Sequence, residues 1–137
     1  MKTCYIYART ATDTISDKGT SLERQIAECQ KYAEKYDIKV LEIFAETASG
    51  VDFKRKELQR LLRACENNPT DAVLIIDTDR LSRGVKDFAK IYQILRNQNI
   101  QLISTRIGNL SESSSGSLLG FIDAAIAQFE LERSREK

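Results

Sequence analysis

The strongest constraint on the fold is a regular alternation of short apolar runs with longer segments of helical periodicity. Runs that suit strands lie at residues 4–7, 40–45, 72–76 and 101–104. Between and after them, apolar residues recur every three or four positions, as on one face of an amphipathic helix. These helical segments are 22–36, 57–66, 85–97 and the stretch from residue 118 onward. The alternation predicts an α/β fold with a mostly parallel sheet and helices on both faces.

Local signals refine the ends of these elements. Residues 20–23, Thr-Ser-Leu-Glu, match a capping box with Thr20 as the N-cap of the first helix. The apolar stripe of that helix is expected to run from Leu22 to Tyr36. Residues 72–76 are apolar without alternation, as in a central strand covered on both faces. Residues 46–52 and 106–116 are predicted to be loops.

Composition excludes several classes of protein. A length of 137 residues suits one domain. The chain has 21 Lys plus Arg and 20 Asp plus Glu, so its surface cannot be uniformly basic, as that of many nucleic-acid-binding proteins is. The absence of His removes histidine triads and His–metal sites. Three scattered cysteines are expected to be buried free thiols in a reducing compartment. With no apolar run long enough for a bilayer and no secretory leader, we expect a cytoplasmic protein without a membrane partner.

Basic residues gather where the predicted strands end, the usual place for a site in a parallel sheet. Arg9 follows the first strand, whereas Arg80 and Arg83 follow the third. The segment 53–63 holds five basic residues against the single acid Glu57. Guanidinium groups in this arrangement suit a phosphate, which predicts a local basic belt. An ordinary solvated charged face is the alternative.

Five motifs follow one another in a distinctive order. They are Tyr7-Ala8-Arg9-Thr10-Ala11, Ser21-Leu22-Glu23-Arg24-Gln25, Ser49-Gly50 with Arg55, Asp79-Arg80-Leu81-Ser82-Arg83, and Phe129-Glu130-Leu131-Glu132-Arg133. Over the whole chain this pattern resembles the catalytic domain of the serine recombinases, the resolvase/invertase family that includes phage integrases and transposon recombinases. The resemblance implies a resolvase-like three-layer sandwich with a long C-terminal helix.

The resemblance also implies a reaction and its residues. A serine would cleave double-stranded DNA through a 5′-phosphoserine intermediate, without metal or cofactor, for DNA integration or another recombination. Arg9, Arg80 and Arg83 would clamp the phosphate, and Asp79 would orient an arginine or move a proton. The positioning residues would be Gln25, Arg55 and Tyr7.

One departure from the family pattern concerns the nucleophile. Ala11 occupies the serine position, and a methyl group cannot attack phosphorus. In an extended segment Thr10 and Thr12 face away from that side, so neither is expected to substitute. The chain is therefore predicted to be inactive as given. The intact arginine set favours a deliberate replacement of serine over a naturally inactive recombinase paralogue. Thr14 and Ile15 stand where relatives often carry Gln.

The resemblance divides the chain into a catalytic core, residues 1–115, and the start of a long dimerisation helix, residues 116–137. The charged run that ends the sequence suggests a fragment without its DNA-binding domain. A homodimer, and a tetramer during strand exchange, would form through an apolar surface on this helix. The alternative is that the same residues are an ordinary apolar stripe that packs against the core of their own domain. Its residues are Leu118, Leu119, Ile122, Ile126 and Phe129.

A binding module is the remaining alternative. Asp77 and Asp79 near a strand end would suit a flavodoxin- or receiver-like domain for a phosphorylated ligand. Against it, Arg80 and Arg83 crowd these acids, and no Gly-rich phosphate loop is present.

Overall fold

The computed structural model describes residues 2–10, 21–47, 55–77, 80–81 and 85–110. In chain order the elements are β1 (Lys2–Thr10), α1 (Leu22–Lys35), β2 (Ile38–Thr47), α2 (Lys56–Asn67), β3 (Ala72–Ile75), α3 (Val85–Asn97), β4 (Gln101–Ser104) and β5 (Gly108–Asn109). The predicted bounds of α3 and β4 are confirmed, and the other predicted elements in this part of the chain begin or end within a few residues of those expected.

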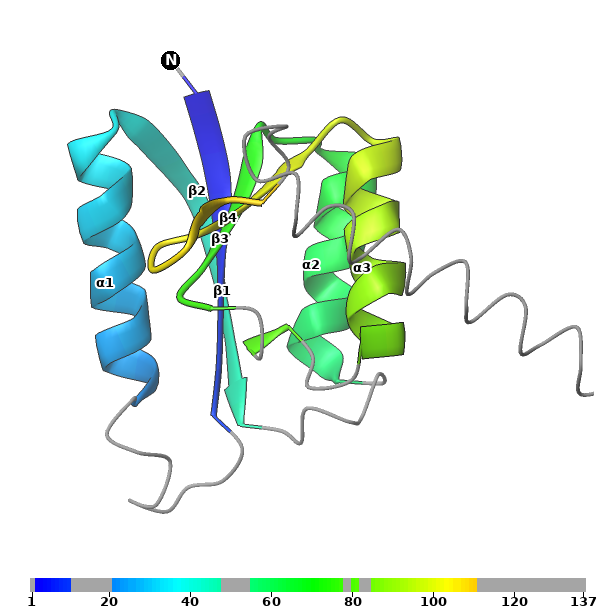
Figure 1. The fold of residues 1–137 in the computed structure, drawn as a ribbon, viewed down its shortest axis with the longest axis horizontal. Coiled ribbons are helices and arrows are strands. Elements are labelled where there is room, and N and C mark those ends of the chain that lie inside the picture. The colour runs from blue at the N-terminus through cyan, green and yellow to red at the C-terminus, as the bar shows by residue number, and fades with distance from the viewer. Residues whose placement is uncertain (1, 11–20, 48–54, 78–79, 82–84, 111–137) are drawn as a thin grey trace, which may run out of the picture.

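The strands form one sheet in the order β2-β1-β3-β4-β5 (Figure 1). The pairs β1–β2, β1–β3 and β3–β4 are parallel, whereas β5 runs antiparallel to β4. This confirms the predicted mostly parallel α/β sheet. The short strand β5 was missed, because its two residues lie in a segment predicted to be a loop.

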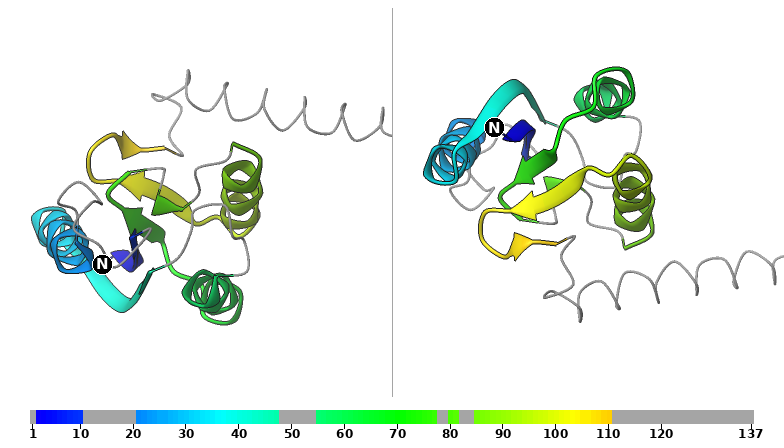
Figure 2. Two further views of the ribbon diagram at one scale, coloured as in Figure 1. Left: turned by 90° about the horizontal axis from the view of Figure 1, so that it is seen from below. Right: turned by 90° about the horizontal axis from the view of Figure 1, so that it is seen from above.

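Helices cover both faces of the sheet (Figure 2). On one face α1 packs Cys29 and Ala33 against Cys4 and Ile6 of β1. On the other face α2 and α3 pack against the alternate residues of the same strands, including Tyr5, with residues such as Leu58 and Ile91. The three-layer sandwich expected from the sequence is therefore present in the described residues.

The central strands explain their own sequence pattern. In β3 the side chains of Val73 and Ile75 enter the core under α2 and α3, while Leu74 enters the core under α1. All three are fully buried. A strand covered on both faces has no solvent side, which is why residues 72–76 show no polar alternation. The cysteines are buried free thiols, as predicted.

Three local predictions were wrong. The N-cap of α1 is Ser21 rather than Thr20, because the Ser21 hydroxyl accepts a hydrogen bond from the Arg24 amide. Tyr36 is 54% exposed, since α1 ends at Lys35 and Tyr36 is its C-cap. Glu46 and Thr47 extend β2 instead of beginning a loop, because they pair with the last two residues of β1. The predicted helix from residue 118 and the division at residue 116 lie outside the described residues.

Candidate functional site

Two arginines meet where β1 and β3 end. Arg9, in β1, is wholly buried, and Arg80, in the turn after β3, is only 6% exposed. Arg9 Nε donates to the carbonyl oxygen of Arg80 at 2.9 Å, and Arg80 Nη1 donates to the carbonyl oxygen of Arg9 at 3.0 Å. Because parallel neighbours end at the same edge of a sheet, two motifs 71 residues apart in sequence share one place.

Gln25 holds the backbone of Arg9 from the side of α1. Its Nε2 donates to the Arg9 carbonyl at 2.9 Å, and its Oε1 accepts from the Arg9 amide at 3.1 Å. The side chain is buried. A primary amide offers both a donor and an acceptor, so one side chain satisfies both backbone groups as a neighbouring strand would. Gln25 therefore fixes the end of β1 against α1.

Arg55 joins the cluster from the residue before α2. It is 3% exposed; Nη1 donates to the Arg80 carbonyl at 3.2 Å, and Nη2 donates to the Leu81 carbonyl. Its guanidinium carbon lies 5.6 Å from the centre of the Tyr7 ring, within cation–π range. Its buried Nε has no hydrogen-bond partner among the described residues. The Arg80 carbonyl thus accepts from both Arg9 and Arg55, and three guanidinium groups share one buried location.

An acid that the sequence analysis missed braces this location. The Tyr7 hydroxyl donates to Glu46 Oε2 at 2.7 Å. The same carboxylate accepts from the amides of Glu57, at 3.1 Å, and Leu58, at 3.0 Å. It therefore caps the N-terminus of α2, where the N-cap residue Arg55 makes no side-chain cap of its own. Lys54, Arg55 and Lys56, which precede the predicted helix, are poor N-cap residues, and this is a sequence signal that could have directed attention to a cap from another element.

Burial determines the protonation state of the Tyr7 phenol. Removal from water raises the pKa of Tyr7, and the hydrogen bond to Glu46 raises it further. Tyr7 is consequently a neutral donor at physiological pH. Its ring supports Arg55 while its hydroxyl supports Glu46, so one side chain connects the guanidinium cluster to the start of α2.

The predicted basic belt of residues 53–63 is not one continuous face. Arg55 points inward, whereas Arg60 pairs with Glu57 at 2.7 Å and with Glu42 at 2.9 Å. The solvated-face interpretation therefore fits Arg60 and fails for Arg55. The residues of that segment before Arg55 lie outside the described part.

Of the sequence-predicted site residues, the structure brings Tyr7, Arg9, Gln25, Arg55 and Arg80 together. Three further site residues and the predicted oligomer interface lie outside the described residues: Ala11, Asp79, Arg83, Leu118, Leu119, Ile122, Ile126 and Phe129. Within the described part, no group of three or more His, Cys, Asp or Glu side chains could hold a metal ion. No described helix is both long and apolar enough to cross a membrane.

The comparison with protein families agrees with this geometry. Residues 4–137 match the family model for the resolvase N-terminal domain. The chain belongs to this family, the catalytic domains of the serine recombinases. Membership in this family excludes the alternative interpretation of the chain as a flavodoxin- or receiver-like binding module.

Curated relatives are longer than this chain. It is 34% identical over 132 residues to a putative DNA recombinase of Bacillus subtilis, a match that covers 96% of this chain and 26% of that protein. It is 31% identical over 103 residues to the Tn21 resolvase of Escherichia coli, covering 73% of this chain and 54% of that resolvase. The chain therefore spans about a quarter to about half of these relatives.

Solved structures share the fold. The N-terminal catalytic domain of TP901-1 integrase matches with a TM-score of 0.80 and 30% identity, over 96% of this chain and 98% of that one. The C-terminal catalytic domain of ISC1926 TnpA, an IS607-like serine recombinase, matches with a TM-score of 0.66 and 34% identity, over 75% and 68% of the two chains. Similar domains thus occur at either end of longer recombinases.

Proposed function

We propose that this domain serves site-specific recombination of double-stranded DNA, and that Ala11 stands where the reaction requires a nucleophilic serine. The observation that carries the proposal is the gathering of Arg9, Arg55 and Arg80 at the end of β1, the strand that leads directly to residue 11. Arg83 and Asp79 would complete the group from the turn that carries Arg80.

The chemistry follows from the needs of phosphoryl transfer. A serine oxygen at position 11 would form a bond to phosphorus, and the bond from phosphorus to the 3′ oxygen would break, leaving a phosphoserine and a free 3′ hydroxyl. Charge that develops on the phosphoryl oxygens needs fixed positive groups, and guanidinium groups supply them. Attack by a 3′ hydroxyl on the phosphoserine would rejoin the strands and release the serine.

The neighbouring threonine does not offer a replacement. Thr10 is 6% exposed, and its hydroxyl shares a hydrogen bond of 3.1 Å with the Thr47 hydroxyl of β2. The oxygen is thus occupied in the sheet. An alanine at position 11 has no lone pair to offer, so the covalent route is closed in this chain.

Assembly is the remaining part of the proposal. Residues 116–137 would begin the dimerisation helix, and two dimers would meet as a tetramer during strand exchange. The apolar set at Leu118, Leu119, Ile122, Ile126 and Phe129 would supply the contact. Homo-oligomers bury such self-complementary faces.

The test restores the nucleophile. The whole protein that carries this domain is given the substitution Ala11→Ser and expressed in its own host. Lysis in detergent, capture of the protein under denaturing conditions and sequencing of attached DNA should recover DNA at recurrent sites, blocked at the 5′ end and extendable at the 3′ end. The Ala11 protein, treated in parallel, should recover none. A restored protein that carries no DNA would refute the cleavage role and favour a naturally inactive paralogue.

A further inference from the structure

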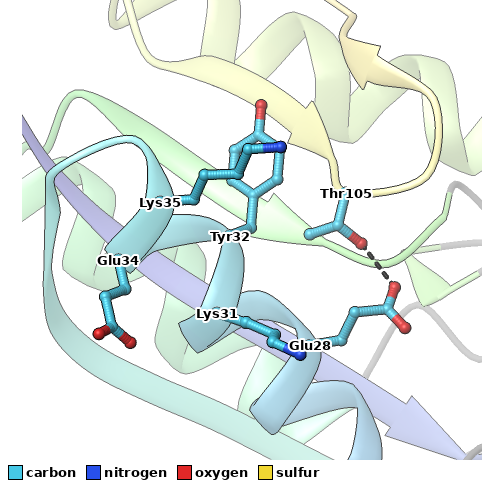
Figure 3. Close-up of a pocket in the computed structure, with 6 residues that line it drawn as sticks. All are labelled: Glu28, Lys31, Tyr32, Glu34, Lys35 and Thr105. Carbon is cyan, nitrogen blue, oxygen red and sulfur yellow. Dashed lines mark hydrogen bonds between the residues drawn. The ribbon is translucent and has the colours of Figure 1, made fainter.

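An ion-pair network lies beside the arginine cluster and joins α1 to the ends of β3 and β4. Arg106 Nε donates to Glu28 Oε2 at 3.1 Å, and Arg106 Nη2 donates to Glu28 Oε1 at 3.3 Å. Arg106 Nη1 lies 3.5 Å from Oδ2 of Asp77, which follows β3. The Thr105 hydroxyl also donates to Glu28, at 2.7 Å (Figure 3). One guanidinium thus bridges two carboxylates from separate elements.

The backbone that carries Arg106 is fixed to β3. The buried Ser104 hydroxyl donates to the Ile76 carbonyl at 2.8 Å and accepts from the Arg106 amide at 3.3 Å. The Thr105 amide donates to the Ile75 carbonyl at 2.8 Å. These hydrogen bonds fix the backbone of Arg106 relative to the end of β3, so they also limit the positions that its guanidinium group can occupy.

Asp77 begins the turn that presents Arg80. The Arg80 amide donates to the Asp77 carbonyl at 3.2 Å. The other carboxylate oxygen of Asp77, Oδ1, is buried and accepts no hydrogen bond from a described residue. Among the described residues, Arg106 is the cation that pairs with this carboxylate.

Together these hydrogen bonds and ion pairs form a closed ring of contacts that begins and ends at α1. Gln25 and Glu28 are three residues apart and therefore lie on one face of α1. Through Gln25 the helix holds Arg9, and through Glu28 it holds Arg106. The closed path runs from α1 through Gln25, Arg9, Arg80, Asp77, Arg106 and Glu28 back to α1.

We propose that Arg106 is a positioning residue, which fixes the turn bearing Arg80 through Asp77 and is itself anchored by Glu28. The inference rests on the proposed function, for which the placement of Arg80 matters. Arg106 acts through Asp77 and needs no contact with DNA. The role requires a planar fork, because a single side chain must reach oxygens on two carboxylates at once.

The first test needs no activity. Arg106→Ala is compared with Arg60→Ala, a matched control whose side chain is 50% exposed against 47% for Arg106 and which also bridges two carboxylates. Hydrogen exchange at the Arg80 amide, followed by NMR, should accelerate by about fivefold or more in Arg106→Ala and stay unchanged in Arg60→Ala. Unchanged exchange at Arg80 in Arg106→Ala would overturn the inference.

A charge swap distinguishes a positioning effect of Arg106 on Arg80 from a general contribution of its ion pair to the stability of the domain. Glu28→Arg combined with Arg106→Glu restores an attractive pair between α1 and β4 but places a second acid beside Asp77. The urea midpoint should return toward that of the parent, whereas the Arg80 amide should remain fast. Recovery of slow exchange at Arg80 in the swapped protein would show that Asp77 does not transmit the effect.

The activity arm distinguishes this inference from the proposed function. In the whole protein carrying Ala11→Ser, Arg80→Ala should abolish the covalent DNA adduct, and Arg106→Ala should slow its formation about tenfold. If Arg80→Ala abolishes the adduct while Arg106→Ala behaves as Arg60→Ala does, the inference fails and the proposed function stands. If Arg80→Ala leaves the adduct intact, the proposed role of the cluster fails, and exchange at the Arg80 amide alone decides whether Arg106 positions the turn.

Discussion

Replacement of the half-buried Glu46 by alanine should destabilise the domain more than replacement of an exposed acid such as Glu42. The carboxylate accepts three hydrogen bonds: from the Tyr7 hydroxyl at 2.7 Å and from the amides of Glu57 and Leu58 at 3.1 and 3.0 Å. Alanine removes all three at once. The first turn of α2 then loses its cap, because Arg55 supplies no side-chain cap.

The magnitude follows from these contacts. Loss of a helix cap costs about 0.5–2 kcal/mol. A buried hydroxyl left without an acceptor, here that of Tyr7, costs about 1–3 kcal/mol more. Water entering the vacated space recovers part of this, so we expect the free energy of unfolding to fall by about 2–3 kcal/mol. Glu46→Gln retains an acceptor oxygen and should lose about half as much.

Urea unfolding of the 137-residue chain measures the effect, with Glu42→Ala as the control. Glu42 is exposed and pairs with Arg60 at the surface, so its removal should cost less than about 1 kcal/mol. The near-ultraviolet signal of tyrosine should also change in Glu46→Ala. A loss in Glu46→Ala no larger than that in Glu42→Ala would refute the assignment of Glu46 as the brace of this site.

Other consequences can be measured in the same chain. Burial raises the pKa of the Cys29 thiol to about 12, so alkylation at pH 8 should be slow in the folded protein and fast in urea; equal rates would contradict it. The hydrogen bond from Arg106 lowers the pKa of Glu28, so its contribution to stability should be present at neutral pH and disappear as the pH falls below about 4.5. Glu28→Gln should flatten that part of the pH profile. Gln25→Leu should cost about 1–3 kcal/mol, because the Arg9 amide loses the Gln25 acceptor and the Arg9 carbonyl keeps Arg80 but loses its Gln25 donor; an unchanged urea midpoint would contradict it.

The elements of the fold were predictable because their signals are local. The bounds of α3 and β4 follow from apolar spacing alone, since α3 buries residues that recur every three or four positions and β4 is a short run buried on both faces of the sheet. Strand β5 has two residues, too few for any period to be visible. The N-cap of α1 was misplaced by one residue, because Thr20 and Ser21 are both good caps and only backbone geometry chooses between them.

The site was predictable in part for a different reason. Parallel strands end at one edge, so Arg9 and Arg80 could be expected to meet. Their burial, and the use of backbone carbonyls as their partners, depends on side-chain directions that the sequence does not encode locally. The contact between Glu28 and Arg106 joins residues 78 positions apart, and no spacing rule connects them.

In the proposed function, the buried arginines at the ends of β1 and β3 serve a DNA phosphate next to residue 11. Its most direct test counts the covalent DNA adduct of the Ala11→Ser protein after denaturation, with and without Arg9→Ala or Arg80→Ala. We expect an abundant adduct in the serine protein and a loss of about 100-fold or more in each arginine variant that still folds. An undiminished adduct in both folded variants would contradict it.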